Sequence, residues 1–264
     1  MGMKSAAINA CDRVEAVVDA LEDWYLQPLG RSLWDQFDSQ LESLLPKIFG
    51  YHVLWLGLIP EGSAPMAHSR IHHHCHICPG HKHADVRSSL EALPVQSESV
   101  DLVVMMHALE LTPDPHQLLR EVDRVLVPEG EVLIVHFNPV SWYGLWRMLF
   151  RWRGTVPWCL PFYTGFRIRD WLSLLGYDVG SSKGWGYSPP FQREGIYQRL
   201  AWYERFSGRY LRLFYGLSLI HAKKRVATLT PIRHRWQPGR SLMGNGKLAE
   251  PTSRENGLAR NKTK

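Results

Sequence analysis

The chain has 264 residues, of which 45% are hydrophobic and 21% charged, and its formal net charge is +6. This composition favours one globular domain with a sizeable core over two full domains. Residues 237–264 hold six basic and two acidic residues, so this segment supplies +4 of the net charge. We expect a disordered basic tail there, and the weakly charged remainder gives little reason to expect a nucleic-acid partner.

The first 48 residues are expected to form two amphipathic helices that cover the core. Apolar residues recur at helical spacing in both. They are Val14, Val17, Val18, Leu21 and Trp24 in the first, and Leu33, Trp34, Phe37, Leu41, Leu44 and Leu45 in the second. Residues 1–13 contain no apolar run of signal-peptide length, and no segment reaches the length of a membrane-spanning helix. We therefore expect a cytoplasmic protein.

Three strands are predicted in the next segment, over residues 51–58, 69–77 and 82–86. About ten residues separate the first two, which is too few for a full crossover helix. Pro60 and Pro65 also oppose a regular helix in this connection. The first two strands are therefore expected to be joined by an unusually short connection.

The clearest pattern is strand, helix and strand. Residues 100–106 and 131–137 are almost purely apolar, as strands covered on both faces would be. Between them, Asp114 can cap a helix that Pro115 opens, and Glu129-Gly130 can turn the chain into the second strand. Such a unit implies a parallel pair with a right-handed connection. Ligands bind at the carboxyl ends of strands in these sheets, which places His107, Glu110 and Asn138 at the expected edge of the site.

The remaining segments complete a mostly parallel sheet. An aromatic segment, about 141–166, precedes a helix that Gly176 can end, and strands are predicted at 177–182 and 217–223, the last one antiparallel. The aromatic segment is open to three interpretations: a cap packed on the sheet, a lid over an apolar acceptor, or peripheral membrane contact through residues 141–153.

Several motifs resemble the class I S-adenosylmethionine-dependent methyltransferases of the type 11 subgroup. The matching pieces are Leu93-Pro94-Val95, Val100-Asp101, the run from Leu118 to Glu121, and the run from Arg124 to Gly130. The resemblance implies a Rossmann-like sheet with helices on both faces over residues 49–230. It also implies S-adenosylmethionine as cofactor and methyl transfer to a small-molecule acceptor.

The cofactor motif of that family is degenerate in this chain. The close-set glycines are missing after the first strand, and no acid ends the second strand. The candidate cofactor-binding residues are Gly57, Glu61, Gly62, Asp85, Ser89 and Leu90. The alternative is a catalytically inactive binding or scaffold protein on the same fold.

His107 is the candidate catalytic residue, as a general base for an acceptor that must lose a proton; a histidine that only packs locally is the other interpretation.

Residues 68–83 hold seven of the 13 histidines, together with Cys75 and Cys78. A zinc site needs four convergent ligands, usually as two separated pairs, and no second pair follows. We therefore favour an exposed strand and loop over a metal-binding regulator. The four cysteines do not suggest a disulfide framework.

Overall fold

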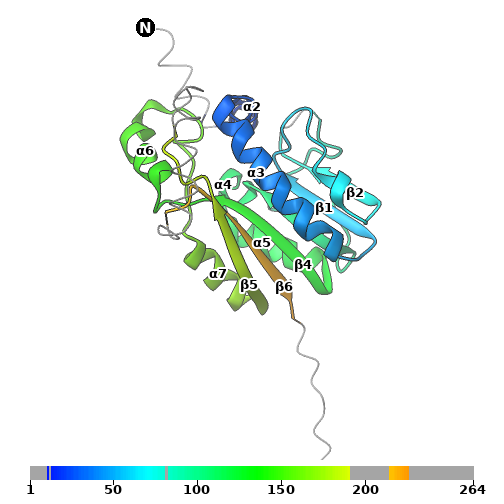
Figure 1. The fold of residues 1–264 in the computed structure, drawn as a ribbon. Coiled ribbons are helices and arrows are strands. Elements are labelled where there is room, and N and C mark those ends of the chain that lie inside the picture. Colours follow the sequence, from blue (N-terminus) through cyan, green and yellow to red (C-terminus); the bar gives the residue numbers. More distant parts are fainter. Residues whose placement is uncertain (1–10, 12, 81–82, 191–213, 226–264) are drawn as a thin grey trace, which may run out of the picture. The chain divides into compact units, whose positions relative to one another are not determined.

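The computed structural model describes residue 11 and residues 13–80, 83–190 and 214–225 (Figure 1). The predicted basic tail, 237–264, and Lys82 lie outside these residues. The described residues all belong to one compact unit, residues 1–226.

The strands among the described residues form one six-stranded sheet, in the order β2-β1-β3-β4-β6-β5, at the centre of this unit. The first four strands in this order are parallel, whereas β6 runs antiparallel to both of its neighbours, β4 and β5. This arrangement confirms the predicted sheet with its antiparallel last strand. The strands are β1 (His52–Gly57), β2 (His73–Ile77), β3 (Val100–Met106), β4 (Leu126–Phe137), β5 (Tyr177–Trp185) and β6 (Leu217–Lys224).

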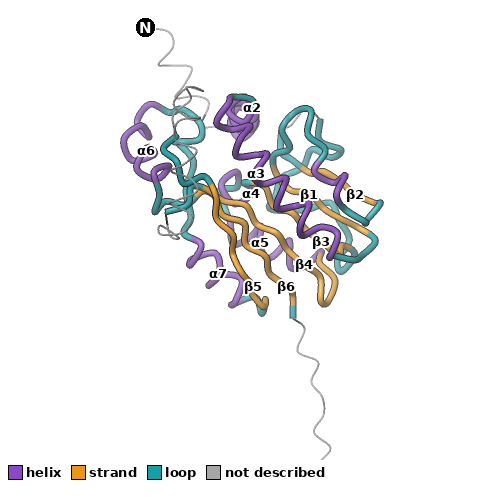
Figure 2. Tube along the Cα trace, in the orientation of Figure 1, coloured by secondary structure: helices purple, strands orange, loops and turns teal. Residues whose placement is uncertain are grey.

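Helices cover both faces of the sheet (Figure 2). On one face, Trp34 and Phe37 of the helix Pro28–Leu44 pack on Trp55 of β1, with ring centroids 6.5 and 6.3 Å from the centroid of the Trp55 ring. On the other face, His116 and Trp171 bring two helices together, with ring centroids 4.5 Å apart. The helices are α2 (Val14–Tyr25), α3 (Pro28–Leu44), α4 (Ala108–Leu111), α5 (Pro115–Val125), α6 (Trp142–Phe150) and α7 (Gly165–Leu174), with 3-10 turns η1 (Leu45–Lys47), η2 (Pro65–His68) and η3 (Arg151–Arg153).

The β3–α5–β4 unit follows the sequence prediction closely. The Asp114 carboxylate accepts hydrogen bonds from the backbone N–H groups of His116 and Gln117, both at 3.0 Å, and so caps α5. At the other end of α5, the Arg124 guanidinium donates to Glu121 and to the backbone oxygens of Leu93 and Val95. The arginine therefore fastens the loop before β3 to the helix.

Three local predictions were wrong. The expected strand at 82–86 is reduced to one parallel bridge between Ile77 and Val86, because only Val86 in this polar stretch reaches the sheet edge. The second strand is shorter than 69–77, since the Ser69 hydroxyl accepts from the Ile71 N–H in a local turn and β2 begins only at His73. The expected turn at Glu129-Gly130 lies inside β4, where Glu129 has a φ of +64° and the register with β3 shifts.

The prediction for the cysteines was also wrong in one respect. Cys11 and Cys159 form a disulfide, with their Cα atoms 6.5 Å apart, whereas Cys75 and Cys78 are free. The two bonded residues are 148 positions apart in the sequence, so their proximity depends on how the segment before α2 meets the aromatic segment. No spacing rule reveals such a contact.

Candidate functional site

The carboxyl end of β1 requires glycine at position 57. Gly57 has a φ of +94°, and a Cβ atom there would lie 2.1 Å from the backbone oxygen of Met106 on β3. Any side chain would push the two strands apart, which only glycine avoids. The imidazole of His76 donates from Nε2 to the Gly57 oxygen at 2.7 Å, so β2 also holds this end of β1.

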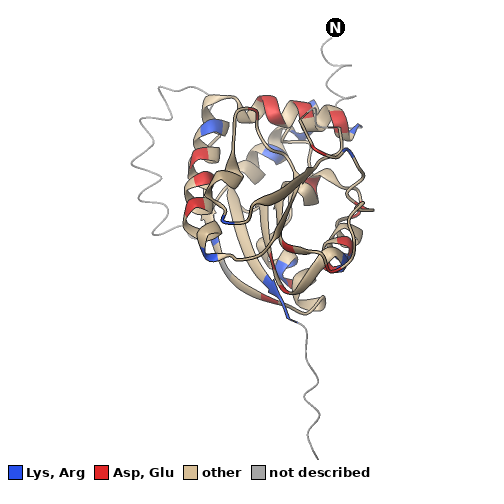
Figure 3. Ribbon diagram, turned by 90° about the vertical axis from the view of Figure 1, so that its right-hand side faces the viewer, with Lys and Arg blue, Asp and Glu red and all other residues tan. Residues whose placement is uncertain are grey.

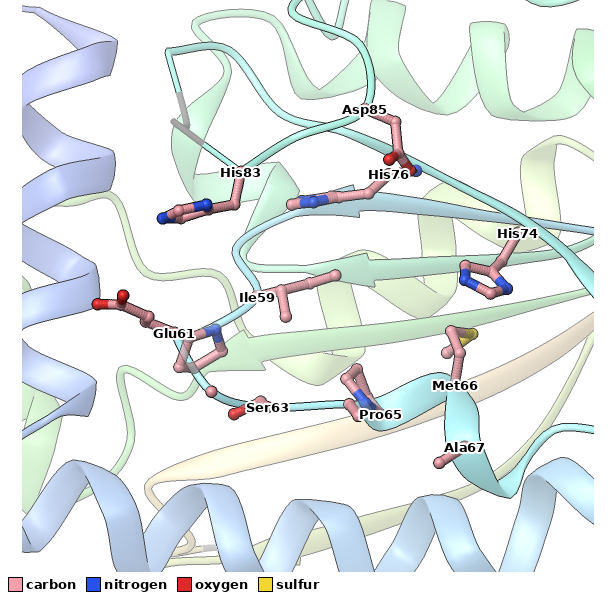
Figure 4. A pocket seen from close by; sticks show the side chains of 13 residues that line it. Ile59, Glu61, Ser63, Pro65, Met66, Ala67, His74, His76, His83 and Asp85 are labelled. Atoms are coloured by element: carbon pink, nitrogen blue, oxygen red, sulfur yellow. The ribbon is translucent and has the colours of Figure 1, made fainter.

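A cavity of about 550 Å³ lies beside this strand end, because η2 replaces a crossover helix between β1 and β2. Figure 4 shows His76, His83 and Asp85 along one wall, with Ser63 and Pro65 opposite. The volume is in the range of small-ligand sites. Trp55 is buried against α3 and does not line the cavity, and Pro60 forms part of its wall.

Two predicted carboxylates line this cavity. The Asp85 Oδ2 atom accepts from the His76 backbone N–H at 2.8 Å, while Glu61 is exposed on the loop. Gly62 has a φ of +77° and nothing within 4 Å of the position of a Cβ atom, so the loop is open at this point. The structure therefore brings Glu61, Gly62 and Asp85 together around one space, next to Gly57.

A second cavity, of about 440 Å³, collects the other predicted cofactor residues. Ser89 and Leu90 line it, together with Leu111 from the end of α4. Glu15, in the first turn of α2, also lines this cavity, and its Cγ atom lies 2.3 Å from the position of a Cβ atom at Gly80. Gly80 follows β2, where the resembled family has an acid. Sequence reasoning missed Glu15, since nothing in its spacing relates it to β2.

His107 is held in a closed network. The Tyr25 hydroxyl and His107 Nε2 are 2.7 Å apart, and His107 Nδ1 lies 3.6 Å from a Glu110 carboxylate oxygen. All three side chains are buried. Burial, and then the Glu110 charge, raise the pKa of Tyr25 well above its ordinary value, so its hydroxyl stays protonated and shares a hydrogen bond with His107 Nε2. His107 lines neither of the two cavities.

The other two residues predicted at the site edge are engaged with the backbone. Glu110 Oε1 accepts from the Phe137 N–H at 2.8 Å. The Asn138 side chain accepts from the Val140 N–H and donates to the oxygens of Val140 and Tyr215. Asn138 therefore shapes the turn after β4.

The histidine-rich segment places three imidazoles, those of His74, His76 and His83, in the first cavity. His74 and His76 share one face of β2, as their spacing predicts, and His83 lies on the loop that follows β2. Among the residues that the structure describes, no three His, Cys, Asp or Glu side chains converge in a metal-binding arrangement. His81, which belongs to this segment, lies outside them.

Known proteins resemble this chain in sequence. The profile of the methyltransferase domain family matches residues 70–134. An uncharacterised Escherichia coli protein, YafS, is 32% identical over 167 residues, covering 63% of this chain and 69% of YafS. The ubiquinone/menaquinone biosynthesis C-methyltransferase UbiE of Rubrivivax gelatinosus is 28% identical, over 58% of this chain and 57% of UbiE. The chain thus spans a little over half of that enzyme.

Solved structures resemble it in fold. An S-adenosylmethionine-dependent methyltransferase from Thermotoga maritima superimposes with a TM-score of 0.54, over 80% of this chain and 98% of that protein, at 16% identity. Among the described residues, no helix has both the length and the apolar character needed to cross a bilayer. The sheet order, the motifs around α5 and these relatives agree, and the chain belongs to the class I S-adenosylmethionine-dependent methyltransferases of the type 11 subgroup.

Proposed function

We propose that this protein transfers a methyl group from S-adenosylmethionine to a small-molecule acceptor. The observation that carries the proposal is the cavity of about 550 Å³ beside Gly57, in a connection too short for a crossover helix. Gly57 lets β1 pack closely against β3 at this strand end. Gly62 leaves open space further along the loop, where a ligand can approach the backbone.

The residues around the two cavities suit the chemistry of this cofactor. Carboxylates such as Glu61 and Asp85 can accept hydrogen bonds from an ammonium group or from ribose hydroxyls. Glu15, lying over Gly80, can replace the acid that is missing after β2. Leu90 and Leu111 offer an apolar surface for a purine ring. When bound, S-adenosylmethionine supplies an electrophilic methyl group, and the protein's part is to orient the reactants and exclude water.

His107 remains our candidate for proton removal from the acceptor. Its Nε2 atom is occupied by Tyr25, so an acceptor would reach the imidazole only by displacing Tyr25 or through its hydroxyl. A quinone-type ring is the first acceptor to test, because UbiE is named for that chemistry. Aromatic side chains surround His107, among them Phe137, whose ring centroid lies 4.3 Å from that of the imidazole. Such surroundings would suit a quinone-type ring.

A catalytically inactive scaffold on the same fold is the second candidate. Two observations favour it: no acidic residue lies directly after β2, at positions 78–80, and His107 Nε2 is hydrogen-bonded to the buried Tyr25 hydroxyl. An inactive scaffold could retain the fold and the buried network while binding no cofactor.

Calorimetry with S-adenosylmethionine and S-adenosylhomocysteine separates these candidates. We expect saturable binding at micromolar ligand, whereas absence of heat at millimolar ligand would reject the enzyme. The double variant Glu61→Gln, Asp85→Asn should lower affinity at least about tenfold, since each lost charge-assisted hydrogen bond contributes about 1.5–3 kcal/mol. Asp85→Asn keeps an oxygen for the His76 N–H, and Asp35→Asn on the exposed side of α3 is the matched control. Unchanged affinity would reject the carboxylate assignment.

A further inference from the structure

Helix α6 and the turn η3 present an unusual apolar face to water. Met148 is 80% exposed and Trp152 is 69% exposed, and their spacing of four residues places them on one side of the helix. Three more residues lie at the same helical spacing on this side, and we call the five together the α6 face. The α6 face consists of Trp142, Leu145, Met148, Leu149 and Trp152.

The opposite side of α6 is apolar as well, because it anchors the helix to the body of the protein. Tyr143 is fully buried, and Trp146 and Phe150 pack against the core. A helix that is apolar all round is expected inside a protein or in a lipid environment. Trp152 Nε1 already donates to the Leu149 oxygen at 2.8 Å, so this indole offers an apolar ring with its N–H group satisfied.

The chain segment that carries the α6 face is basic. Residues 132–169 contain five arginines and no acidic residue. Arg151 and Arg153 are exposed beside the face, and the Arg153 guanidinium lies 4.9 Å and 5.2 Å from the ring centres of Phe150 and Trp152. The N-terminal helices differ, since acidic residues lie along α2 and α3 (Figure 3). An acid-free apolar helix bordered by arginines is complementary to an anionic lipid surface.

We propose that the α6 face docks this protein onto an anionic bilayer, with its apolar side chains among the acyl chains and its arginines at the headgroups. Tryptophan and arginine both suit this boundary, since each joins an apolar body to a polar group. Helix α6 begins five residues after β4 ends, so docking would hold the carboxyl edge of the sheet near the bilayer. The inference goes beyond the proposed methyl transfer and does not depend on it.

Flotation of the full chain with vesicles tests the proposal. We expect binding to vesicles of equal parts phosphatidylglycerol and phosphatidylcholine, and weaker binding to phosphatidylcholine alone. The double variant Met148→Glu, Trp152→Glu should lower the partition coefficient at least about tenfold, because it removes two apolar anchors and adds two like charges. The apolar pair Met148→Leu, Trp152→Phe should retain binding. Phe49→Glu, Leu174→Glu, at residues that are 72% and 80% exposed on other elements, is the matched control.

Three outcomes would overturn the proposal. The first is vesicle binding that the Met148→Glu, Trp152→Glu variant leaves unchanged, since the basic segment at 237–264 would then account for it. The second is absence of binding to either vesicle. The third is a wild-type dimer in light scattering that this variant dissociates while vesicle binding is absent, because the α6 face would then join two copies of the chain. Unfolding curves check that the exposed substitutions leave the fold intact.

Discussion

Two of the connections between parallel strands in this sheet are built differently. Between β3 and β4, the 11-residue helix α5 is capped by Asp114 and packs a full apolar side onto the strands. Between β1 and β2, the chain makes only the four-residue turn η2, and about 550 Å³ beside the strands stays open. The comparison shows that one connection stabilises the sheet, whereas the other leaves space for a ligand at the cost of packed surface.

The largest expected effect is at the strand end next to the open space. Gly57→Ala would place a Cβ atom against the Met106 oxygen at a φ of +94°, so we expect a loss of about 3 kcal/mol or more in the free energy of unfolding. Gly62→Ala shares the positive φ but meets open space, and should cost about 1 kcal/mol. Urea denaturation measures both. Equal losses would show that β1 and β3 are not locked together at Gly57.

A smaller loss of stability is expected at the hydrogen bond between Tyr25, at the end of α2, and His107, which follows β3. Tyr25→Phe removes the hydrogen-bond partner of His107 Nε2 in a dry environment, which should cost about 1–3 kcal/mol. Tyr51→Phe is the control, because Tyr51 is 79% exposed. If both variants unfold at the same denaturant concentration, the buried hydrogen bond contributes nothing.

The well-packed connection should tolerate the loss of one arginine. Arg124→Met leaves Glu121 and the oxygens of Leu93 and Val95 without their donor, but part of the side chain is exposed and water can compensate. We expect a loss of about 1–2 kcal/mol in thermal or urea unfolding. Arg120→Met, on the exposed side of α5, should be nearly neutral. If Arg120→Met lowers the free energy of unfolding as much as Arg124→Met does, the hydrogen bonds from Arg124 to the loop before β3 do not stabilise the protein.

The smallest expected effect is a dependence on pH in the same connection. The hydrogen bond from Arg124 lowers the pKa of Glu121 from its ordinary value of 4.5. The stabilisation is therefore present above pH 4.5 and is lost as the pH falls through the lowered value, where the folded protein takes up the proton. Glu121→Gln should flatten the stability curve between these two values in urea unfolding at several pH values. If the free energy of unfolding of this variant depends on pH as steeply as that of the wild type, the hydrogen bond between Arg124 and Glu121 does not cause the pH dependence.

The same contrast explains what could be predicted from the sequence. The β3–α5–β4 unit depends on local signals, namely two apolar runs, a cap at Asp114 and helical spacing, and all of them act within a few residues. The β1–β2 connection was predicted to be short, and Glu61, Gly62 and Asp85 do line one cavity, beside the strand end at Gly57. The proximity of Glu15 to Gly80, the hydrogen bond from Tyr25 to His107, and the disulfide were not predicted, since each depends on where the N-terminal segment lies in the folded chain.

The central claim is that the shortened β1–β2 connection binds the cofactor. Hydrogen–deuterium exchange of the full chain, with and without S-adenosylhomocysteine, tests it most directly because it locates the ligand without requiring an acceptor. We predict slower exchange at residues 57–67 and 83–91, with α5 unchanged. Protection elsewhere, or none at a ligand concentration that saturates binding, would contradict the claim.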